Sequence, residues 1–175
     1  METTIAVSRM LLCGVFDRHP TLKLFLAHSG GTLPFLAGRL ESCIQHDAYL
    51  EKSGKLQNRR RVWDVLKTNI MLDAVVYSSV GLRAAVEAAG AERVFFGTCV
   101  LLDLIVLLDL TRSHLLNDQG TDHPFFPPLE QDEGGEPEWL SVTTNYKAID
   151  AGFDGDGAKA AAVLGGNAVR LLNLA

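Results

Sequence analysis

Three short apolar runs alternate with helical patterns along this chain, and this alternation restricts the possible fold more than any other feature. The runs are residues 22–27, 70–76 and 94–96. Each is almost entirely apolar, as expected of a strand buried on both faces of a parallel sheet. Strands that alternate with helices are typical of βα units. The sequence therefore predicts an α/β fold with a parallel sheet covered by helices.

The first two helices are indicated by capping residues that precede apolar positions at helical spacing. Thr3 or Thr4 is expected to cap the first helix, and Thr32 the second, which has Pro34 in its first turn. The apolar stripe of the first helix is expected to consist of Ile5, Leu11, Leu12, Val15 and Phe16. Residues 47–58 are polar and are interpreted as a linker.

Later helices are predicted in the same way. A short helix follows the three arginines 59–61, which are interpreted as its solvated start. Ser78 or Ser79 caps the next helix, and Gly90 closes it. Residues 139–151 are expected to be helical, and residues 158–174 form a last helical region that Gly165 and Gly166 interrupt. Asp154 or Asp156 is expected to start that region.

The third apolar run, which reaches Gly97, is followed by an interruption. Gly-Thr occurs at 97–98 and again at 120–121, and removal of residues 98–120 leaves a continuous strand-to-loop sequence, Phe-Phe-Gly-Thr-Asp-His-Pro. We interpret residues 98–120 as an insert, and a retained intron as its origin; a tolerated loop insertion is the alternative. Its apolar part, residues 99–110, is shorter than the ~20 residues that cross a bilayer.

Composition narrows the class of protein. A length of 175 residues indicates one domain, here residues 1–175. The net charge of −5 argues against a nucleic-acid partner. Three widely spaced cysteines indicate neither a disulfide framework nor a zinc knuckle. With no secretory signal or membrane span expected, a cytoplasmic location is predicted.

Two polar side chains are candidates for chemistry because they follow predicted strands. His28 follows the first strand, and Asp122 follows the third if the insert is disregarded. Carboxyl ends of parallel strands meet at one edge, where active sites gather. An imidazole and a carboxylate there suit metal binding, or acid–base work on a metal-bound water. A turn histidine and an Asx turn are the alternatives for these two residues.

The other ionisable candidates carry less weight. Asp73 lies within the second apolar run, so its carboxylate must be paired or belong to the site. His123 can line the same edge or serve in packing. His19 and His46 are expected at the surface, and His114 is given no role. No GxGxxG or GxxxxGK[ST] pattern is present, so the sequence does not support a nucleotide site.

Three motifs resemble one enzyme family. Ala-His-Ser-Gly-Gly-Thr-Leu-Pro at 27–34, followed by Arg39, is similar to the sixth-strand motif of the amidohydrolase-related decarboxylases, such as aminocarboxymuconate semialdehyde and 6-methylsalicylate decarboxylases. Phe96-Gly97 continued by residues 121–125 resembles their eighth-strand motif. Residues 164–172 resemble their C-terminal helix. The likeness covers the chain except residues 98–120.

The resemblance implies a fold, a reaction and roles for three residues. The family fold is a (β/α)8 barrel around a divalent metal, usually zinc, and this chain would supply about strands six to eight. Asp122 would be a metal ligand, and His28 would orient or activate the metal-bound water and relay protons. Arg39 would bind the substrate carboxylate, often from a neighbouring subunit, which implies a homodimer. The implied reaction is non-oxidative decarboxylation of a small aromatic or unsaturated carboxylic acid, with no organic cofactor.

The chain departs from the family pattern in one respect. Family members carry His-x-His after the first barrel strand and another histidine near the end of the fifth, and this chain has no His-x-His. We therefore expect strands one to five, and two or three metal ligands, to be absent from it. Two alternatives stay open: hydrolysis of a lactone or amide by metal-bound hydroxide, and a catalytically inactive truncated fragment.

Overall fold

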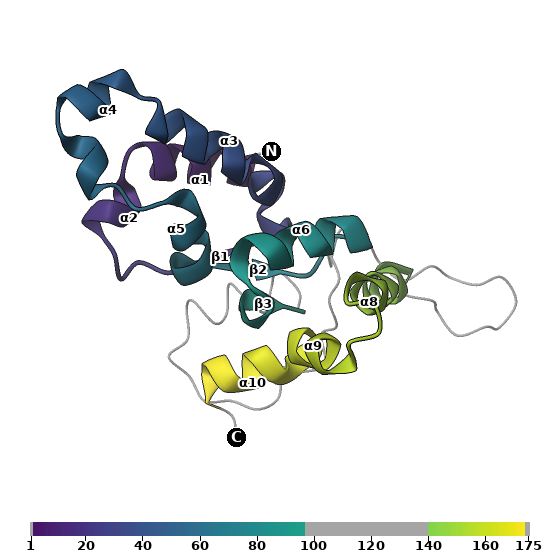
Figure 1. Cartoon of the computed structure of the whole chain (residues 1–175). Coiled ribbons are helices and arrows are strands. Elements are labelled where there is room, and N and C mark those ends of the chain that lie inside the picture. The colour runs from purple at the N-terminus through teal and green to yellow at the C-terminus, as the bar shows by residue number, and fades with distance from the viewer. Residues whose placement is uncertain (1, 97–139, 174–175) are drawn as a thin grey trace, which may run out of the picture.

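The computed structural model describes residues 2–96 and 140–173, and its centre is a small parallel sheet (Figure 1). The strands are β1 (Leu24–Leu26), β2 (Ile70–Asp73) and β3 (Val94–Phe95), in the order β1-β2-β3. Leu26 pairs with Leu72, and Leu72 pairs with Val94. The predicted parallel sheet and its three strands are confirmed, although each strand is shorter than the apolar run that contains it.

The two faces of the sheet have different neighbours, because side chains alternate along a strand. Ile70, Leu72 and Val94 lie on one face and are at most 1% exposed, as members of the main apolar core. The register places Phe25, Met71 and Phe95 on the other face. There, the rings of Phe25 and Phe95 lie 5.4 Å apart between centroids. The face that carries Leu72 is therefore the one buried in the main apolar core.

Three helices cover the Leu72 face and a fourth lies beyond them. α5 (Val62–Asn69) and α6 (Ser79–Ala89) contact β2, and α3 (Leu33–Gln45) packs against both helices. α1 (Glu2–Leu12) packs on α3. Figure 1 shows these four helices on one side of the strands, with α8 to α10 on another. In this arrangement Val65 and Leu66 of α5, and Leu82 and Ala85 of α6, are at most 2% exposed.

The C-terminal helices complete the described part of the chain. α8 (Leu140–Gly152) packs on α6, and α9 (Gly157–Ala161) leads through a π-helical turn, η4 (Ala162–Gly166), into α10 (Asn167–Leu172), which contacts β3. The predicted break at Gly165–Gly166 is thus confirmed. The buried Asn167 side chain donates to the carbonyls of Ala91 and Val94, each at 2.7 Å. This amide ties α10 to the start of β3.

The first helix and the polar linker differ from the prediction. Gly14 takes a left-handed conformation, with φ of 70°, and ends α1, so Phe16 belongs to a separate short helix, α2 (Val15–Arg18). Ile5 and Leu12 are then 48% and 44% exposed, so they are not part of the buried stripe. The segment interpreted as a linker contains α4 (Ala48–Lys52), capped by Asp47, and a 3₁₀ turn, η2 (Lys55–Asn58). Local capping by Asp47 outweighs the polar composition.

The predicted helix caps Thr32, Ser78 and Asp156 lie at the expected positions, but only Asp156 makes a capping hydrogen bond with its side chain. Ser78 precedes α6 and Thr32 precedes α3, but neither side chain makes the capping hydrogen bond. Asp156 does cap α9, accepting from the Lys159 amide at 3.2 Å. Gly90, with φ of 97°, closes α6 as predicted. Another 3₁₀ turn, η3 (Ala91–Arg93), then leads into β3.

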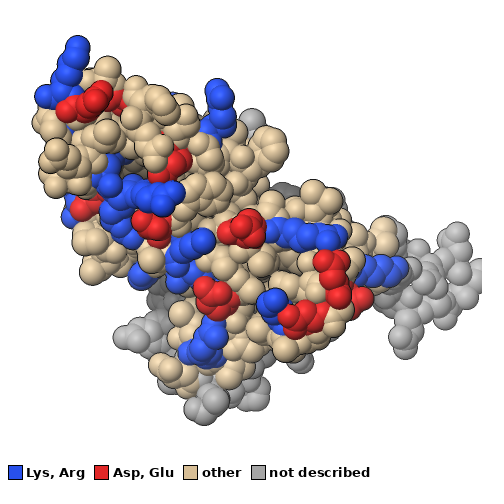
Figure 2. Space-filling view, viewed as in Figure 1, with Lys and Arg blue, Asp and Glu red and all other residues tan. Residues whose placement is uncertain are grey.

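Charges of both signs are interspersed over the face of the molecule in Figure 2.

The arginine cluster at 59–61 precedes α5 as predicted, but the prediction that its first member, Arg59, is solvated is wrong. The Arg59 side chain is 10% exposed and pairs with Asp17 at 3.3 Å. It donates from Nη2 to the carbonyls of Leu11 and Leu12 at 2.6 and 2.9 Å. Arg59 therefore binds the carbonyl end of α1, where a cation is favoured.

Replacement of Arg59 by methionine is expected to lower the free energy of unfolding by about 2 kcal/mol, since hydrogen bonds from a charged donor are lost. The matched control is Arg61→Met. The Arg61 side chain is 65% exposed, and the Glu41 carboxylate that it pairs with also accepts from the Val62 amide and from Gln45, so about 0–1 kcal/mol is expected. Urea unfolding followed by circular dichroism measures both. An equal loss in the two variants would contradict the role of Arg59.

Within residues 2–96 and 140–173, no helix is long and apolar enough to cross a membrane. Several predictions fall on other residues: the insert at 98–120, Trp139, His114, His123 and Asp122 lie outside the described residues.

Candidate active site

The turn that follows β1 has an unusual backbone. His28, Ser29, Gly30 and Gly31 have φ values of 55°, 49°, 72° and 65°. Two of these residues are not glycine, and left-handed φ values are uncommon for such residues and cluster at functional sites. The turn closes on itself through the Gly30 amide to Ala27 and the Gly31 amide to His28. It presents His28 at the carboxyl end of β1.

Asp73, the last residue of β2, holds this turn. Its Oδ2 accepts from the His28 amide at 2.8 Å, and its Oδ1 accepts from the Ser29 amide at 2.7 Å. Oδ1 also accepts from the Val75 amide at 3.2 Å. The Ser29 hydroxyl donates to the Asp73 carbonyl at 2.5 Å. The prediction that Asp73 is either paired or part of the site is resolved in favour of pairing, with backbone amides.

Burial and hydrogen bonding act on the Asp73 carboxyl in opposite directions. The residue is 0% exposed. Desolvation disfavours the charged form of the carboxyl and raises its pKa. The hydrogen bonds from the amides of Ser29, His28 and Val75, and the nearby charge of His28, lower the pKa. Desolvation is the larger effect, so the pKa is raised from 3.8 to about 6. At neutral pH the group is therefore mostly ionised and able to accept all three amide hydrogen bonds.

Thr4 of α1 holds the other end of the same turn. Its Oγ1 donates to the Gly30 carbonyl at 3.3 Å and accepts from the Thr32 amide at 3.0 Å. A Cβ on Gly31 would lie 2.7 Å from this oxygen, so the close approach requires glycine. Thr4 was predicted as a possible helix cap. Its actual partner lies in a distant turn, which local sequence does not indicate.

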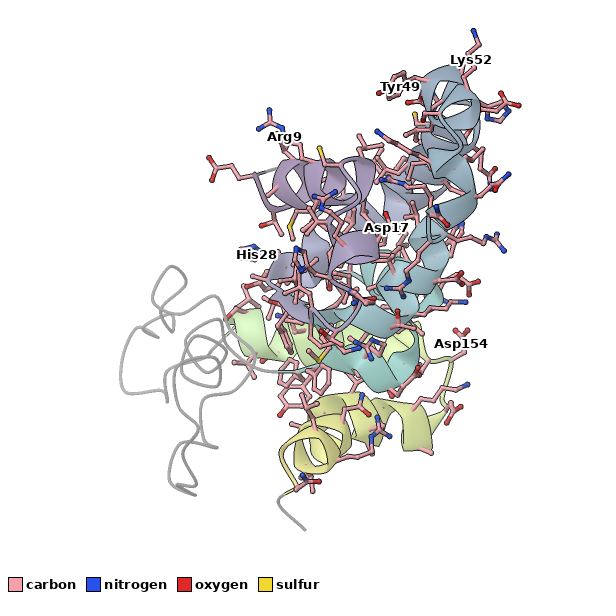
Figure 3. All side chains as sticks on the ribbon, turned by 90° about the vertical axis from the view of Figure 1, so that its left-hand side faces the viewer. Arg9, Asp17, His28, Tyr49, Lys52 and Asp154 are labelled. Atoms are coloured by element: carbon pink, nitrogen blue, oxygen red, sulfur yellow. The ribbon has the colours of Figure 1, made fainter. Side chains whose placement is uncertain are left out.

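The predicted site residues His28 and Arg39 both lie at the surface of the molecule. His28 is exposed at the carboxyl end of β1, and Figure 3 shows it well away from Tyr49 and Lys52 of α4. Arg39 is exposed on α3, the helix that follows the turn. His19 and His46 are exposed, as expected. The structure brings Asp73 to His28, while the position of Asp122 lies outside the described residues.

A second loop at the same edge of the sheet is also fixed from a distance. Asn145 of α8 is 0% exposed, and its Oδ1 accepts from the amides of Val76 and Tyr77 at 3.2 and 2.8 Å. Tyr77 has a φ of 54°. Asn145 was not among the residues predicted from the sequence to be functional. Its spacing with Val142 and Ile149 on one helical face could have indicated a buried amide.

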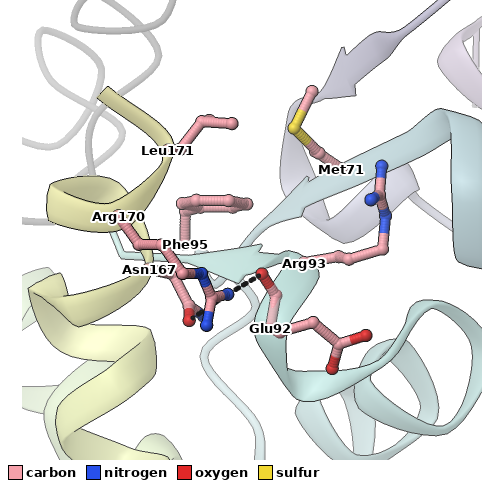
Figure 4. Close-up of a pocket in the computed structure, with 7 residues that line it drawn as sticks. All are labelled: Met71, Glu92, Arg93, Phe95, Asn167, Arg170 and Leu171. Carbon is pink, nitrogen blue, oxygen red and sulfur yellow. Dashed lines mark hydrogen bonds between the residues drawn. The ribbon is translucent and has the colours of Figure 1, made fainter. Parts of the chain in front are cut away.

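A cavity of about 280 Å³ lies elsewhere, beside the amino-terminal end of β3 (Figure 4). It is lined by Met71, Glu92, Arg93, Phe95, Asn167, Arg170 and Leu171. Arg170 lies across it, with hydrogen bonds of 3.1 Å to the Glu92 carbonyl and to Asn167. Because His28 follows the carboxyl end of its strand, this cavity is at the opposite edge of the sheet. We assign the candidate active site to the His28 turn.

The described side chains, those of residues 2–96 and 140–173, do not provide a set of metal ligands. Among them, no group of three or more His, Cys, Asp or Glu side chains is placed to hold a metal ion. A catalytic zinc site takes three protein ligands and a water. Residues 2–96 and 140–173 therefore do not form the implied metal centre on their own, and Asp122 lies outside them.

The family can be stated from comparison with known proteins. The model of the amidohydrolase family, Amidohydro_2, matches residues 1–174, so the chain belongs to this family. The crystal structure of Metarhizium anisopliae IDCase in apo form is 50% identical, with a TM-score of 0.78 over 99% of this chain and 40% of that one. This confirms the resemblance drawn from the motifs.

Curated relatives belong to the same branch. Gamma-resorcylate decarboxylase of Polaromonas sp. is 29% identical over 55% of this chain and 29% of its own length. The 2-amino-3-carboxymuconate-6-semialdehyde decarboxylase of Dictyostelium discoideum is 32% identical over 55% and 26%. The chain thus spans less than a third of the length of these relatives.

A more distant structure shares the fold. The dihydroxybenzoic acid decarboxylase of Polaromonas sp. JS666, solved with bound manganese and the inhibitor 2-nitroresorcinol, is 21% identical, with a TM-score of 0.59 over 98% of this chain and 40% of that one. By the family match and the curated relatives, this chain is related to the carboxy-lyases of the family.

Proposed function

We propose that this chain supplies part of the barrel, about strands six to eight, of a divalent-metal-dependent decarboxylase that acts on a small aromatic or unsaturated carboxylic acid. The observation that carries the proposal is the His28 turn: an exposed imidazole follows a strand of a parallel sheet in a chain whose relatives are decarboxylases. The 50% identity with IDCase supports the same branch. The proposed partner is a second subunit, as in a homodimer.

Each site residue has a proposed role. His28 carries a proton to or from the reacting carbon, since an imidazole gains and loses protons near neutral pH. Arg39 binds the substrate carboxylate by charge-assisted hydrogen bonds, in its own or a neighbouring subunit. Asp122 is a ligand of a divalent metal, zinc or manganese, which supplies electrostatic stabilisation when bound.

The test is a direct assay of the expressed chain. CO₂ release is measured from a panel of aromatic acids, with Zn²⁺ or Mn²⁺ added, and bound metal is determined by elemental analysis. Release of CO₂ with about one metal per chain supports decarboxylation. Hydrolysis of a lactone or amide panel without CO₂ release would support the hydrolase alternative. Neither activity, with metal below one per chain, would support the inactive-fragment hypothesis instead.

Replacement of Arg39 by alanine is expected to raise KM for the acid by about tenfold or more, with a smaller change in kcat, because a charge-assisted carboxylate contact contributes about 1.5–3 kcal/mol. Steady-state kinetics measures both constants. Arg9→Ala is the matched control, since Arg9 is also an exposed helical arginine, on α1. An unchanged KM in the Arg39 variant would remove Arg39 from substrate binding.

A further inference from the structure

The His28 turn is held by a carboxylate on the neighbouring strand, and this carboxylate has no assigned role in the chemistry. Asp73 ends β2 and its side chain is fully buried. It accepts from the amides of His28 and Ser29, which are 45 and 44 residues away in the chain. A fully buried carboxylate is costly unless its oxygens are hydrogen-bonded. Among the described residues, the backbone amides of His28, Ser29 and Val75 donate to this costly carboxylate, and two of them lie in the turn that carries the candidate acid–base residue.

We propose that Asp73 is a positioning residue: its carboxylate fixes the left-handed turn after β1, so that the His28 imidazole is presented at the carboxyl edge of the sheet in one orientation. The proposal rests on the function proposed for His28 and deepens it. Asp73 acts through the backbone of His28.

The backbone geometry explains why a carboxylate is needed. His28 and Ser29 both have left-handed φ values, which cost free energy in residues other than glycine. Their amides point at two different oxygens of the same side chain, Oδ2 and Oδ1. Only a group with acceptors at both positions satisfies both amides. The amide hydrogen bonds thus offset the strain of the turn that carries His28.

Asparagine at position 73 would separate the two halves of this interaction. Its amide has one acceptor oxygen and one donor nitrogen. With the oxygen in the place of Oδ1, the bonds to Ser29 and Val75 are kept, and the nitrogen then faces the His28 amide. The reverse orientation loses two bonds. Asp73→Asn is therefore expected to free the His28 amide selectively.

Ser29→Ala is the matched control. It removes the hydroxyl that donates to the Asp73 carbonyl at 2.5 Å, and it leaves every carboxylate contact in place. A general weakening of the turn would appear in both variants. A specific role of the carboxylate would appear in Asp73→Asn alone.

The experiment uses the full chain and has two arms. Hydrogen exchange by NMR is expected to show the His28 amide exchanging about tenfold faster in Asp73→Asn, with the Ser29 amide within about twofold of wild type. In Ser29→Ala the His28 amide keeps its wild-type rate. In the CO₂ assay, kcat of Asp73→Asn is expected to fall about tenfold with KM within about twofold. A smaller loss of kcat is expected for Ser29→Ala, because that variant keeps the carboxylate contacts.

The two arms separate the proposal from the proposed function. If wild type releases no CO₂, the proposed function fails, and the exchange arm still decides whether Asp73 holds His28. An unchanged His28 exchange rate in Asp73→Asn overturns the proposal, as does an equal loss of kcat in both variants. If Asp73→Asn does not fold, two NMR chemical shifts of the wild-type chain are followed as a function of pH, that of the His28 amide proton and that of the Asp73 carboxyl carbon. A common titration midpoint supports the proposal, and a shift that ignores the Asp73 titration overturns it.

Discussion

Replacement of His28 by asparagine is expected to lower the rate of CO₂ release by about 10²–10⁴-fold, the usual contribution of a general acid or base. Asparagine is suited to this test because it tolerates the left-handed conformation that His28 adopts, with φ of 55°. The variant therefore removes the imidazole and keeps the turn. Steady-state kinetics on the best acid of the panel measures the loss, and circular dichroism verifies the fold.

His46→Asn is the control for this variant. His46 is also exposed and follows α3, and its Nδ1 lies 2.9 Å from the Ser42 carbonyl. α3 begins just after the His28 turn, and His46 follows the other end of this helix. Replacement of His46 is therefore expected to leave the rate within about twofold. Retention of the wild-type rate in His28→Asn would exclude His28 from proton transfer and would leave the decarboxylase proposal without its acid–base residue.

The parallel sheet was predictable because its signal is local. Each strand is a run of apolar residues between helices, and burial on both faces of a parallel sheet requires such a run. The ends of the elements were less predictable. Gly14 splits the first helix through a left-handed φ, and nothing in the apolar spacing indicates this. Asp47 starts α4 inside a polar stretch that composition alone assigns to a linker.

The candidate site was predictable only in part, because its side chains come from distant segments. His28 could be placed at a strand end from the order of the elements. The contact with Asp73 depends on the register of β1 and β2, and the contact with Thr4 depends on how α1 packs on α3. Asn145 reaches Tyr77 across 68 residues. Such hydrogen bonds leave no pattern at short range, so the sequence indicates the residue types but not the pairs.

The pH dependence of stability gives an independent test of the Asp73 environment. The folded pKa is about 6 and the ordinary value is 3.8, so the folded chain holds this proton over a range where the unfolded chain has released it. The contribution of Asp73 to stability is therefore fully present below pH 3.8 and is lost as pH rises through about 6. The difference between a folded pKa of about 6 and an unfolded pKa of 3.8 corresponds to about 3 kcal/mol of unfolding free energy.

The measurement compares wild type with Asp73→Asn, because other titrating groups are common to both. We expect the free energy of unfolding of wild type, relative to the variant, to fall by about 2 kcal/mol between pH 4 and pH 7. Urea unfolding at a series of pH values gives this difference. A rise with pH would mean that the three amide hydrogen bonds outweigh desolvation, so that the folded pKa lies below 3.8. In that case the Asp73 carboxylate of the folded chain would stay ionised at pH 4 and would keep its three amide hydrogen bonds there.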